Sequence, residues 1–298
     1  LDDDFLSLDG TYGKDGQGYR KEKKTSLIKM LKYTDCLLAV NESLAKKYSE
    51  IGKIKKYVLT NTPMDLSSMV KPGLYNEKTK LVFYVNDGTQ DIFNLYIKPL
   101  IPKLYEEFSN KIAVYFMSIR PDLKEYEDHL EIHYVPHMSF EDFLKYIANE
   151  HFDIGLAPLD EDGFSKYKYY NKYVEYTRAG IAGIYTDCSL YRKVVESGYN
   201  GVLCSNSMES WMSAISHLIH NPQQRIKIAE NAQQHAIEHF SGNTVVDKLL
   251  NDLTELGHYK APDRKSSNLK IFLIKAHYWG FRIRGWFYTA YSCIRSGN

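Results

Sequence analysis

The 298-residue sequence lacks several features that would assign a protein to a class at once. It contains no uninterrupted apolar run of membrane-spanning length and no stretch with the pattern of a signal peptide. It contains no internal repeat and no low-complexity segment. The formal net charge of +1 gives no global attraction to nucleic acid. Composition and length are those of an ordinary globular protein with one large domain or two modest ones.

Metal-ligand patterns are also missing. The four cysteines lie far apart, and the ten histidines show no paired ligand spacing. The acidic run 2–4 fits a loop or structural role better than a metal site, because consecutive acids cannot all face one ion from a regular element. We therefore expect no metal. Cys36, Cys188 and Cys204 lie in apolar stretches typical of reduced, packed thiols, which indicates a reducing, cytoplasmic compartment.

Short apolar runs alternate with amphipathic stretches along most of the chain. Such alternation predicts an open α/β fold with a parallel sheet and right-handed crossovers. The segment 10–24 is predicted to be an exposed loop because it is glycine-rich and then charged. We expect strands at 36–41, 55–62, 80–88, 111–119, 131–136, 152–159, 181–187 and 200–206. We expect helices at 25–35, 42–52, 91–108, 139–150, 166–179, 189–198, 208–221 and 222–240.

The stretch KYKYYNKYVEYTRAGIAGIYTD, residues 166–187, places two lysines and a glutamate directly before a buried strand. Lys168 and Lys172 are four apart and Glu175 follows three later, so a helix would carry all three on one side. Cations and helix N-terminal amides suit a diphosphate, and a carboxylate can accept both hydroxyls of a ribose. The alternative is a solvated basic helix with ordinary side-chain pairs.

Several motifs in fixed order resemble the nucleotide-sugar-binding domain of GT-B glycosyltransferases. They are the strand DIGLAPL, the lysine-rich helix that ends in Glu-Tyr, and the SLYRKVVESGYNG helix and turn before a tryptophan helix. The resemblance is closest to the retaining family that contains many bacterial polysaccharide enzymes. Upstream, TDCLLAVNESLAKKY and KKYVLTNTPMD resemble the end of the acceptor-side domain and the crossing into the donor domain. LDDDF resembles an Asp-Asp element of some members, and the likeness covers about 1–253.

This resemblance implies a GT-B type α/β fold, with a Rossmann-like donor domain and a partial second Rossmann-like domain. The expected parts are 1–65 as a remnant of the N-terminal acceptor domain, 66–78 as a linker, 79–253 as the C-terminal nucleotide-sugar-binding domain, and 254–298 as a basic aromatic tail. Any catalytic residue of the acceptor domain is expected to precede Leu1, so none is assigned.

The implied activity is transfer of a sugar, of hexosyl type and retaining, from a nucleotide-sugar to a surface polysaccharide or lipid-linked glycan. No cofactor and no essential metal are implied. Gly88 and Thr89 would approach the phosphates through their amides, and Tyr134 and Val135 would meet the base; a plain turn and a buried strand end are the respective alternatives. The donor-binding residues expected are Lys168, Lys172, Glu175, Gly88, Thr89, Arg120, Tyr134, Val135, Asp162 and Phe164.

The chain also departs from the family pattern. Many members carry an acid eight positions before the ribose acid, where this chain has Tyr167, and only the nearby acids 160–162 could replace it. The Arg and Lys clamp for the diphosphate is missing from NDGTQDIFN. These departures favour an alternative, a non-catalytic GT-B relative that acts as a binding or scaffolding partner. A sugar-nucleotide epimerase is a further alternative.

The C-terminal segment 264–298 carries seven basic residues and no acid. Its aromatic and basic residues match an interfacial membrane segment over 267–295, which would place the protein at the inner face of the cell membrane. The alternative is a helix that packs back across the acceptor domain. Nucleic-acid binding is not expected, since nothing else in the chain supports it.

Overall fold

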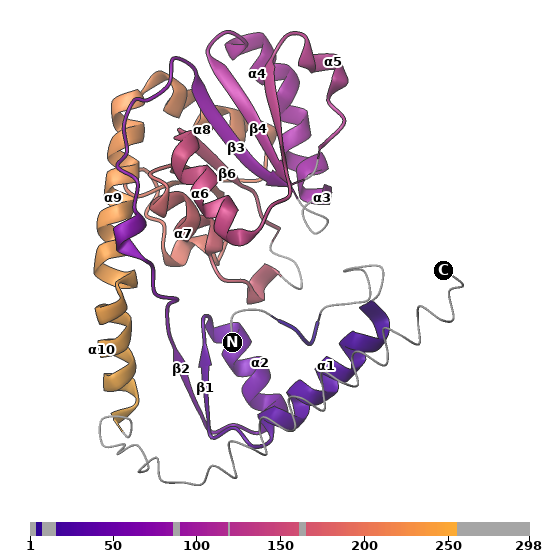
Figure 1. Cartoon of the computed structure of the whole chain (residues 1–298), viewed down its shortest axis with the longest axis vertical. Helices are drawn as coiled ribbons and strands as arrows, with labels where there is room; N and C mark the ends of the chain where they lie inside the picture. Colours follow the sequence, from indigo (N-terminus) through magenta and orange to yellow (C-terminus); the bar gives the residue numbers. More distant parts are fainter. Residues whose placement is uncertain (1–3, 8–15, 86–89, 119, 161–164, 255–298) are drawn as a thin grey trace. The chain divides into compact units, whose positions relative to one another are not determined.

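A computed structural model describes residues 4–7, 16–85, 90–118, 120–160 and 165–254 (Figure 1). The chain forms two compact units, Leu1–Asp252 and Leu253–Asn298. The predicted membrane segment 267–295 lies outside the described residues. Within the first unit the boundaries expected at 65, 78 and 253 stay predictions.

The centre of the first unit is a six-stranded sheet in which every pair of neighbours is parallel. Its spatial order is β5-β4-β3-β6-β7-β8. The chain therefore adds β4 and β5 on one side of β3. It then returns to pair β6 with the other side of β3, and adds β7 and β8 beyond β6. The predicted parallel α/β sheet is confirmed. The strands are β3 Thr79–Val85, β4 Ile112–Ser118, β5 Glu131–Pro136, β6 Ile154–Ala157, β7 Ala182–Thr186 and β8 Val202–Cys204.

Helices cover both faces of this sheet, and each face has its own apolar core. Phe143 of α6 (Phe140–Glu150), Tyr176 of α7 (Asn171–Arg178) and Ala236 of α9 (Pro222–Phe240) pack into one core. Leu104 of α4 (Ile101–Phe108) and Trp211 of α8 (Met208–His220) pack into the other. Strands buried on both sides explain why β4 and β6 read as continuous apolar runs.

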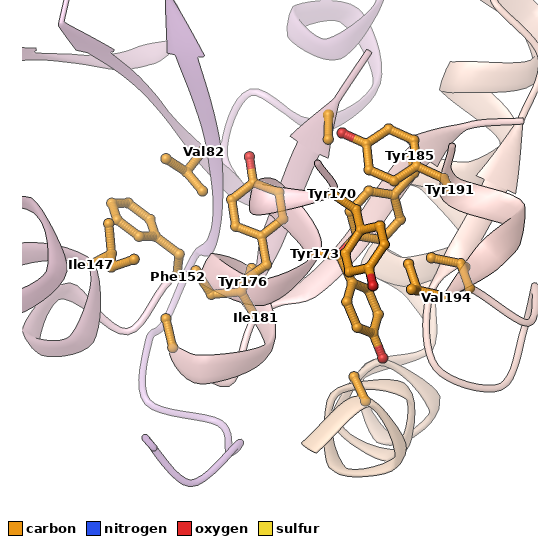
Figure 2. Packing of buried hydrophobic residues seen from close by; sticks show 14 of the residues in the cluster. Val82, Ile147, Phe152, Tyr170, Tyr173, Tyr176, Ile181, Tyr185, Tyr191 and Val194 are labelled. Atoms are coloured by element: carbon orange, nitrogen blue, oxygen red, sulfur yellow. The ribbon is translucent and has the colours of Figure 1, made fainter. Parts of the chain in front are cut away.

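The core under α7 is rich in tyrosine. Figure 2 shows the rings of Tyr173, Tyr176, Tyr185 and Tyr191 gathered with aliphatic side chains, and all four are buried. The Tyr176 hydroxyl donates to the carbonyl of Leu156 in β6, so a polar group is satisfied inside the core. A side chain at Gly155 would place its Cβ 2.5 Å from the Tyr176 ring. Gly155 therefore lets α7 lie directly on β6.

The N-terminal part contains a separate sheet of two parallel strands, β1 and β2, whose small core includes Leu44 and Tyr48. Asn41 caps α2, since its side chain accepts a hydrogen bond from the Leu44 amide. Contacts tie this part to the larger sheet: the Met64 amide donates to the Phe240 carbonyl at the end of α9. The elements are α1 Gly16–Leu31, β1 Cys36–Ala39, α2 Glu42–Gly52, β2 Lys56–Leu59 and, at the C-terminal side, α10 Gly242–Asp252.

Two segments differ from the sequence prediction, one in part and one along its length. The loop predicted at 10–24 was wrong from Gly16 onward, where α1 begins. The charged residues of this segment include Arg, Lys and Glu, which are good helix formers, and that preference outweighs the neighbouring glycines. The single helix predicted at 91–108 was also wrong. It consists of α3 (Gln90–Ile92), a π-helical turn, a 3-10 turn and α4, because Pro99 and Pro102 cannot donate to an earlier carbonyl.

The helix predicted at 189–198 is wrong apart from a 3-10 turn over Tyr191–Lys193. The side chain of Asn200 explains why no helix continues beyond this turn. Its amide oxygen accepts from the Glu196 amide at 2.8 Å and its nitrogen donates to the Val194 carbonyl at 2.9 Å. These bonds replace the backbone pairs that a helix would need. A short helix missed in the sequence, α5, spans Lys124–Glu127.

Candidate functional site

A cavity of about 400 Å³ lies at the carboxyl ends of the central strands. Tyr84 at the end of β3 and Pro158 just after β6 both line it. These two strands are the neighbours at which the strand order reverses, and open α/β sheets bind ligands in the crevice at that point. The cavity therefore occupies the position that the topology favours for a ligand.

Three residues predicted from the sequence line this one cavity: Lys168, Lys172 and Glu175. The Lys172 ammonium lies 2.6 Å from a carboxylate oxygen of Glu175, one turn further along α7. Both side chains are largely shielded, with 27% and 13% of their surfaces exposed. The cavity thus holds a cation and a carboxylate side by side, which suits a ligand with both anionic and hydroxyl groups.

Lys168 reaches the cavity from a different place than predicted. It was expected on the same helix as Lys172, but α7 begins only at Asn171. Tyr169 and Tyr170, which precede the helix, are buried, and their hydroxyls bond to residues 61 and 62. These long-range bonds hold the backbone out of helical geometry. Lys168 therefore approaches the cavity from the segment before the helix, beyond its N-terminal end.

Aromatic side chains form much of the remaining wall, and sequence analysis missed them. The Lys172 ammonium lies 4.3 Å from the centre of the Tyr84 ring and 5.3 Å from that of Phe143. Their spacing in a strand and a helix is that of core residues, so no local signal marks them. Tyr169 and Tyr191 also line the cavity, and burial raises the pKa of both hydroxyls, which stay protonated at neutral pH.

The loop after β5 contributes His137 and Met138 to the cavity. In the sequence the histidines show no ligand pairing, so nothing local marks His137 for such a role. The His137 ring lies 3.3 Å from the Ser118 hydroxyl, and Ser118 has a positive φ of 86° at the end of β4. A non-glycine residue in that conformation stores backbone strain and is found near functional sites more often than elsewhere.

The structure does not bring Arg120, Tyr134 or Val135 into the cavity lining. Arg120 lies 4.4 Å from the centre of the Tyr134 ring and pairs with Glu127 at 2.9 Å. The Tyr134 hydroxyl donates to the same carboxylate, and burial together with this bond raises its pKa to about 12. The ring of Tyr134 packs beside Phe116, against the core that contains Leu104 and Trp211. Val135 is buried in the core next to the cavity.

Four of the predicted residues, Gly88, Thr89, Asp162 and Phe164, lie outside the described residues. Of the three acids that could replace the missing one, only the first is described. Asp160 accepts a hydrogen bond from the Tyr96 hydroxyl at 2.6 Å. Tyr167, which stands where the family acid would be, lies under the Lys47 ammonium at 4.6 Å.

No group of three or more histidine, cysteine or acidic side chains is arranged to hold a metal ion in the part of the chain that the structure describes. Within the same residues, no helix combines the length and apolar character needed to cross a membrane.

Comparison with known proteins gives matches among solved structures. No protein-family model and no curated protein matches the chain. It is similar to TarM from S. aureus at 11% identity and a TM-score of 0.58, over 82% of this chain and 48% of TarM. It is similar to sucrose-phosphate synthase from Thermosynechococcus elongatus at 14% identity and a TM-score of 0.56, over 83% of this chain and 64% of the synthase. It is similar to HepE from Anabaena at 11% identity and a TM-score of 0.56, over 81% of this chain and 68% of HepE.

These similarities establish the fold. The chain has the GT-B fold that its sequence motifs resemble, with a parallel sheet of six strands. It spans about half the length of TarM and less than two thirds of the synthase. Structures of TarM and HepE have been solved in complex with UDP, and one of HepE with UDP and glucose.

Proposed function

We propose that this chain is the donor-binding part of a glycosyltransferase, which binds a nucleotide-sugar in the cavity and transfers its sugar to a glycan. One observation carries the proposal: Lys168, Lys172 and Glu175 meet in a single cavity at the switch point of the sheet. The sequence predicted these three residues for a diphosphate and a ribose. Solved GT-B structures with UDP make UDP the nucleotide to test first.

In this proposal Lys168 and Lys172 bind the diphosphate, and Glu175 accepts the ribose hydroxyls. The Lys172–Glu175 pair holds both groups in place before a ligand arrives. When the bond to the sugar breaks, negative charge grows on the leaving diphosphate. Two cations already aimed at that position stabilise this charge without reorganisation, which lowers the barrier to transfer.

We also propose the type of sugar, the stereochemistry, the cofactor requirement and the acceptor. The donor sugar is a hexose, the anomeric configuration is retained, and no metal or other cofactor is required. The acceptor is a surface polysaccharide or a lipid-linked glycan at the cytoplasmic face of a membrane. The basic aromatic composition of 267–295 supports contact with that surface.

The proposal is tested by titrating the chain with UDP in an isothermal calorimeter, alongside Glu175→Ala and Lys168→Ala. We expect the native chain to bind and both variants to lose affinity by about tenfold or more, since each removes a hydrogen bond to or from a charged group. Arg120→Ala is the matched control, because it removes a cation close to the same sheet but outside the cavity. Its affinity should equal that of the native chain.

The same preparation distinguishes an enzyme from a binding partner. Incubation with UDP-sugars should release UDP slowly by hydrolysis if the chain is a transferase. UDP binding without any turnover, even with glycan acceptors and membranes added, would support the non-catalytic alternative. That alternative has its own support, because Tyr167 replaces the expected acid. An absence of UDP binding would contradict the proposal in this form.

A further inference from the structure

The segment 167–170, which contributes Lys168 and Tyr169 to the cavity, is held along its whole length by the N-terminal part of the chain. The Lys47 ammonium lies over the Tyr167 ring, and the Thr62 amide donates to the Tyr169 hydroxyl at 3.1 Å. The Tyr170 hydroxyl donates to the side chain of Asn61 at 2.6 Å. At Lys168 the contact is to the backbone.

That backbone contact comes from Asn41, whose amide nitrogen donates to the Lys168 carbonyl at 2.9 Å. Asn41 is 3% exposed. The bond spans 127 positions of sequence, and it acts on the main chain of a residue that lines the cavity. Because the main chain is fixed, the starting point of the Lys168 side chain is fixed too.

A second hydrogen bond of Asn41 shows why an asparagine side chain is suited to this position. Its amide oxygen accepts from the Leu44 amide at 2.8 Å and caps α2. Serine, threonine, aspartate and asparagine all cap helices well, but aspartate carries no donor and serine is too short to reach as far. Only the amide offers an acceptor and a donor on separate atoms. Capping alone therefore does not explain asparagine here, whereas capping together with the bond to Lys168 does.

We infer that Asn41 is a positioning residue, which holds Lys168 at the cavity and thereby raises the affinity for the anionic part of the ligand. The inference rests on the proposed function. Asn41 is not among the residues that line the cavity. It acts through the Lys168 carbonyl. The region before residue 65 would then contribute to nucleotide binding without contacting the nucleotide.

The test measures UDP affinity by calorimetry for native chain, Asn41→Ser, Asn41→Asp and Lys168→Ala, and for Lys168→Ala combined with each change at Asn41. Both replacements keep a helix cap. The melting temperature should still fall, and further in Asn41→Asp, because the Lys168 carbonyl loses its donor and aspartate brings a buried charge beside it. Asn41→Ser removes the donor without adding charge, and Asn41→Asp keeps the shape of the side chain. We expect about tenfold weaker UDP binding from each, since a small displacement of a binding group has effects of that size.

The combined variants separate positioning from general damage. If Asn41 acts through Lys168, a change at Asn41 should alter the affinity of Lys168→Ala by less than about twofold. Ser207→Ala removes a comparable cap from α8, which does not line the cavity, and should lower stability while leaving UDP affinity unchanged. An equal tenfold loss in both backgrounds, or native affinity in Asn41→Ser and Asn41→Asp, would overturn the inference alone. A native chain that does not bind UDP would overturn the proposed function and the inference with it.

Discussion

Two shielded ion pairs lie at opposite ends of the strands of the central sheet, and they are built differently. The side at which the strands begin is called the amino edge, and the side at which they end is called the carboxyl edge. At the amino edge, Arg225 of α9 lies 2.8 Å from Asp153, just before β6. Asp153 also accepts from the Lys80 amide and from Asn76, and Arg225 donates to the Leu218 carbonyl. The Arg225 and Asp153 side chains are 6% and 5% exposed. Each member of this pair thus has a further partner within the protein, which points to a structural role.

At the carboxyl edge, Lys172 and Glu175 form a less complete pair. Within the described residues, the hydrogen bond that the Glu175 carboxylate receives comes from Lys172. The pair faces a cavity, and aromatic rings surround the ammonium. Donors and acceptors therefore remain for a ligand. The pair at the amino edge is thus enclosed by the protein, whereas the pair beside the cavity keeps groups that a ligand could bond.

Replacing Arg225 should have the largest effect on stability. Arg225→Met leaves the Asp153 carboxylate buried without its charged partner, and removal of one member of a buried pair costs about 3–5 kcal/mol. Urea unfolding followed by circular dichroism measures this loss. Adding Asp153→Asn should restore part of it, because the buried charge is then removed. A loss below about 1 kcal/mol would show that the amino-edge pair is not structural.

The equivalent change at the carboxyl edge should affect binding instead. Lys172→Met should weaken UDP binding by about 10–100-fold, the effect of losing a hydrogen bond to a charged group. Its free energy of unfolding should fall by less than that of Arg225→Met, since Glu175 faces the cavity and is more exposed than Asp153. Calorimetry and urea unfolding on the same sample check both. A large stability loss with unchanged binding would reverse the assignment of the two pairs.

A change at Gly155 should lower both stability and UDP affinity moderately, because this residue lies in β6 between the two ion pairs. Gly155→Ala places a methyl group against the Tyr176 ring, and overpacking of this kind costs about 1–3 kcal/mol. The displaced α7 carries Lys172 with it, so UDP affinity should fall as well. Gly198→Ala is a useful contrast, since a Cβ there meets no atom within 4 Å, and only its positive φ of 83° is strained. Equal UDP affinity in native chain and Gly155→Ala would contradict the expectation.

The smallest effect should be a dependence of stability on pH. His235 of α9 contacts the Tyr173 hydroxyl of α7 at 2.8 Å and so links the helices that carry the two pairs. Burial lowers its pKa from 6.5 to about 4. Its contribution is therefore complete above pH 6.5 and is lost as the pH falls toward 4, because the unfolded chain binds the proton first. Melting temperatures at pH 7 and pH 5 should differ less in His235→Gln than in the native chain.

Much of the fold follows from local sequence. Apolar runs located the strands of the large sheet, and the helices predicted at 139–150 and 222–240 correspond to α6 and α9. Lys172 and Glu175 were placed correctly on one side of α7, since a spacing of three is a local property of helices.

What the sequence could not reveal depends on distant contacts. Lys168 lies before α7 because the hydroxyls of Tyr169 and Tyr170 bond to residues more than 100 positions away. The rings of Tyr84 and Phe143 meet Lys172 only after β3, α6 and α7 come together. No periodicity in one segment contains that information.

The tyrosine-rich core has a consequence for how this protein responds to alkali. Burial raises the pKa of Tyr173, Tyr176, Tyr185 and Tyr191 well above the usual value of 10. In an unfolded chain these phenols would ionise near pH 10, so strong base favours unfolding. Exposed phenols should ionise first, and the core should follow in one cooperative step. Ultraviolet absorbance of phenolate would then report the release of α7 from the sheet without any added label.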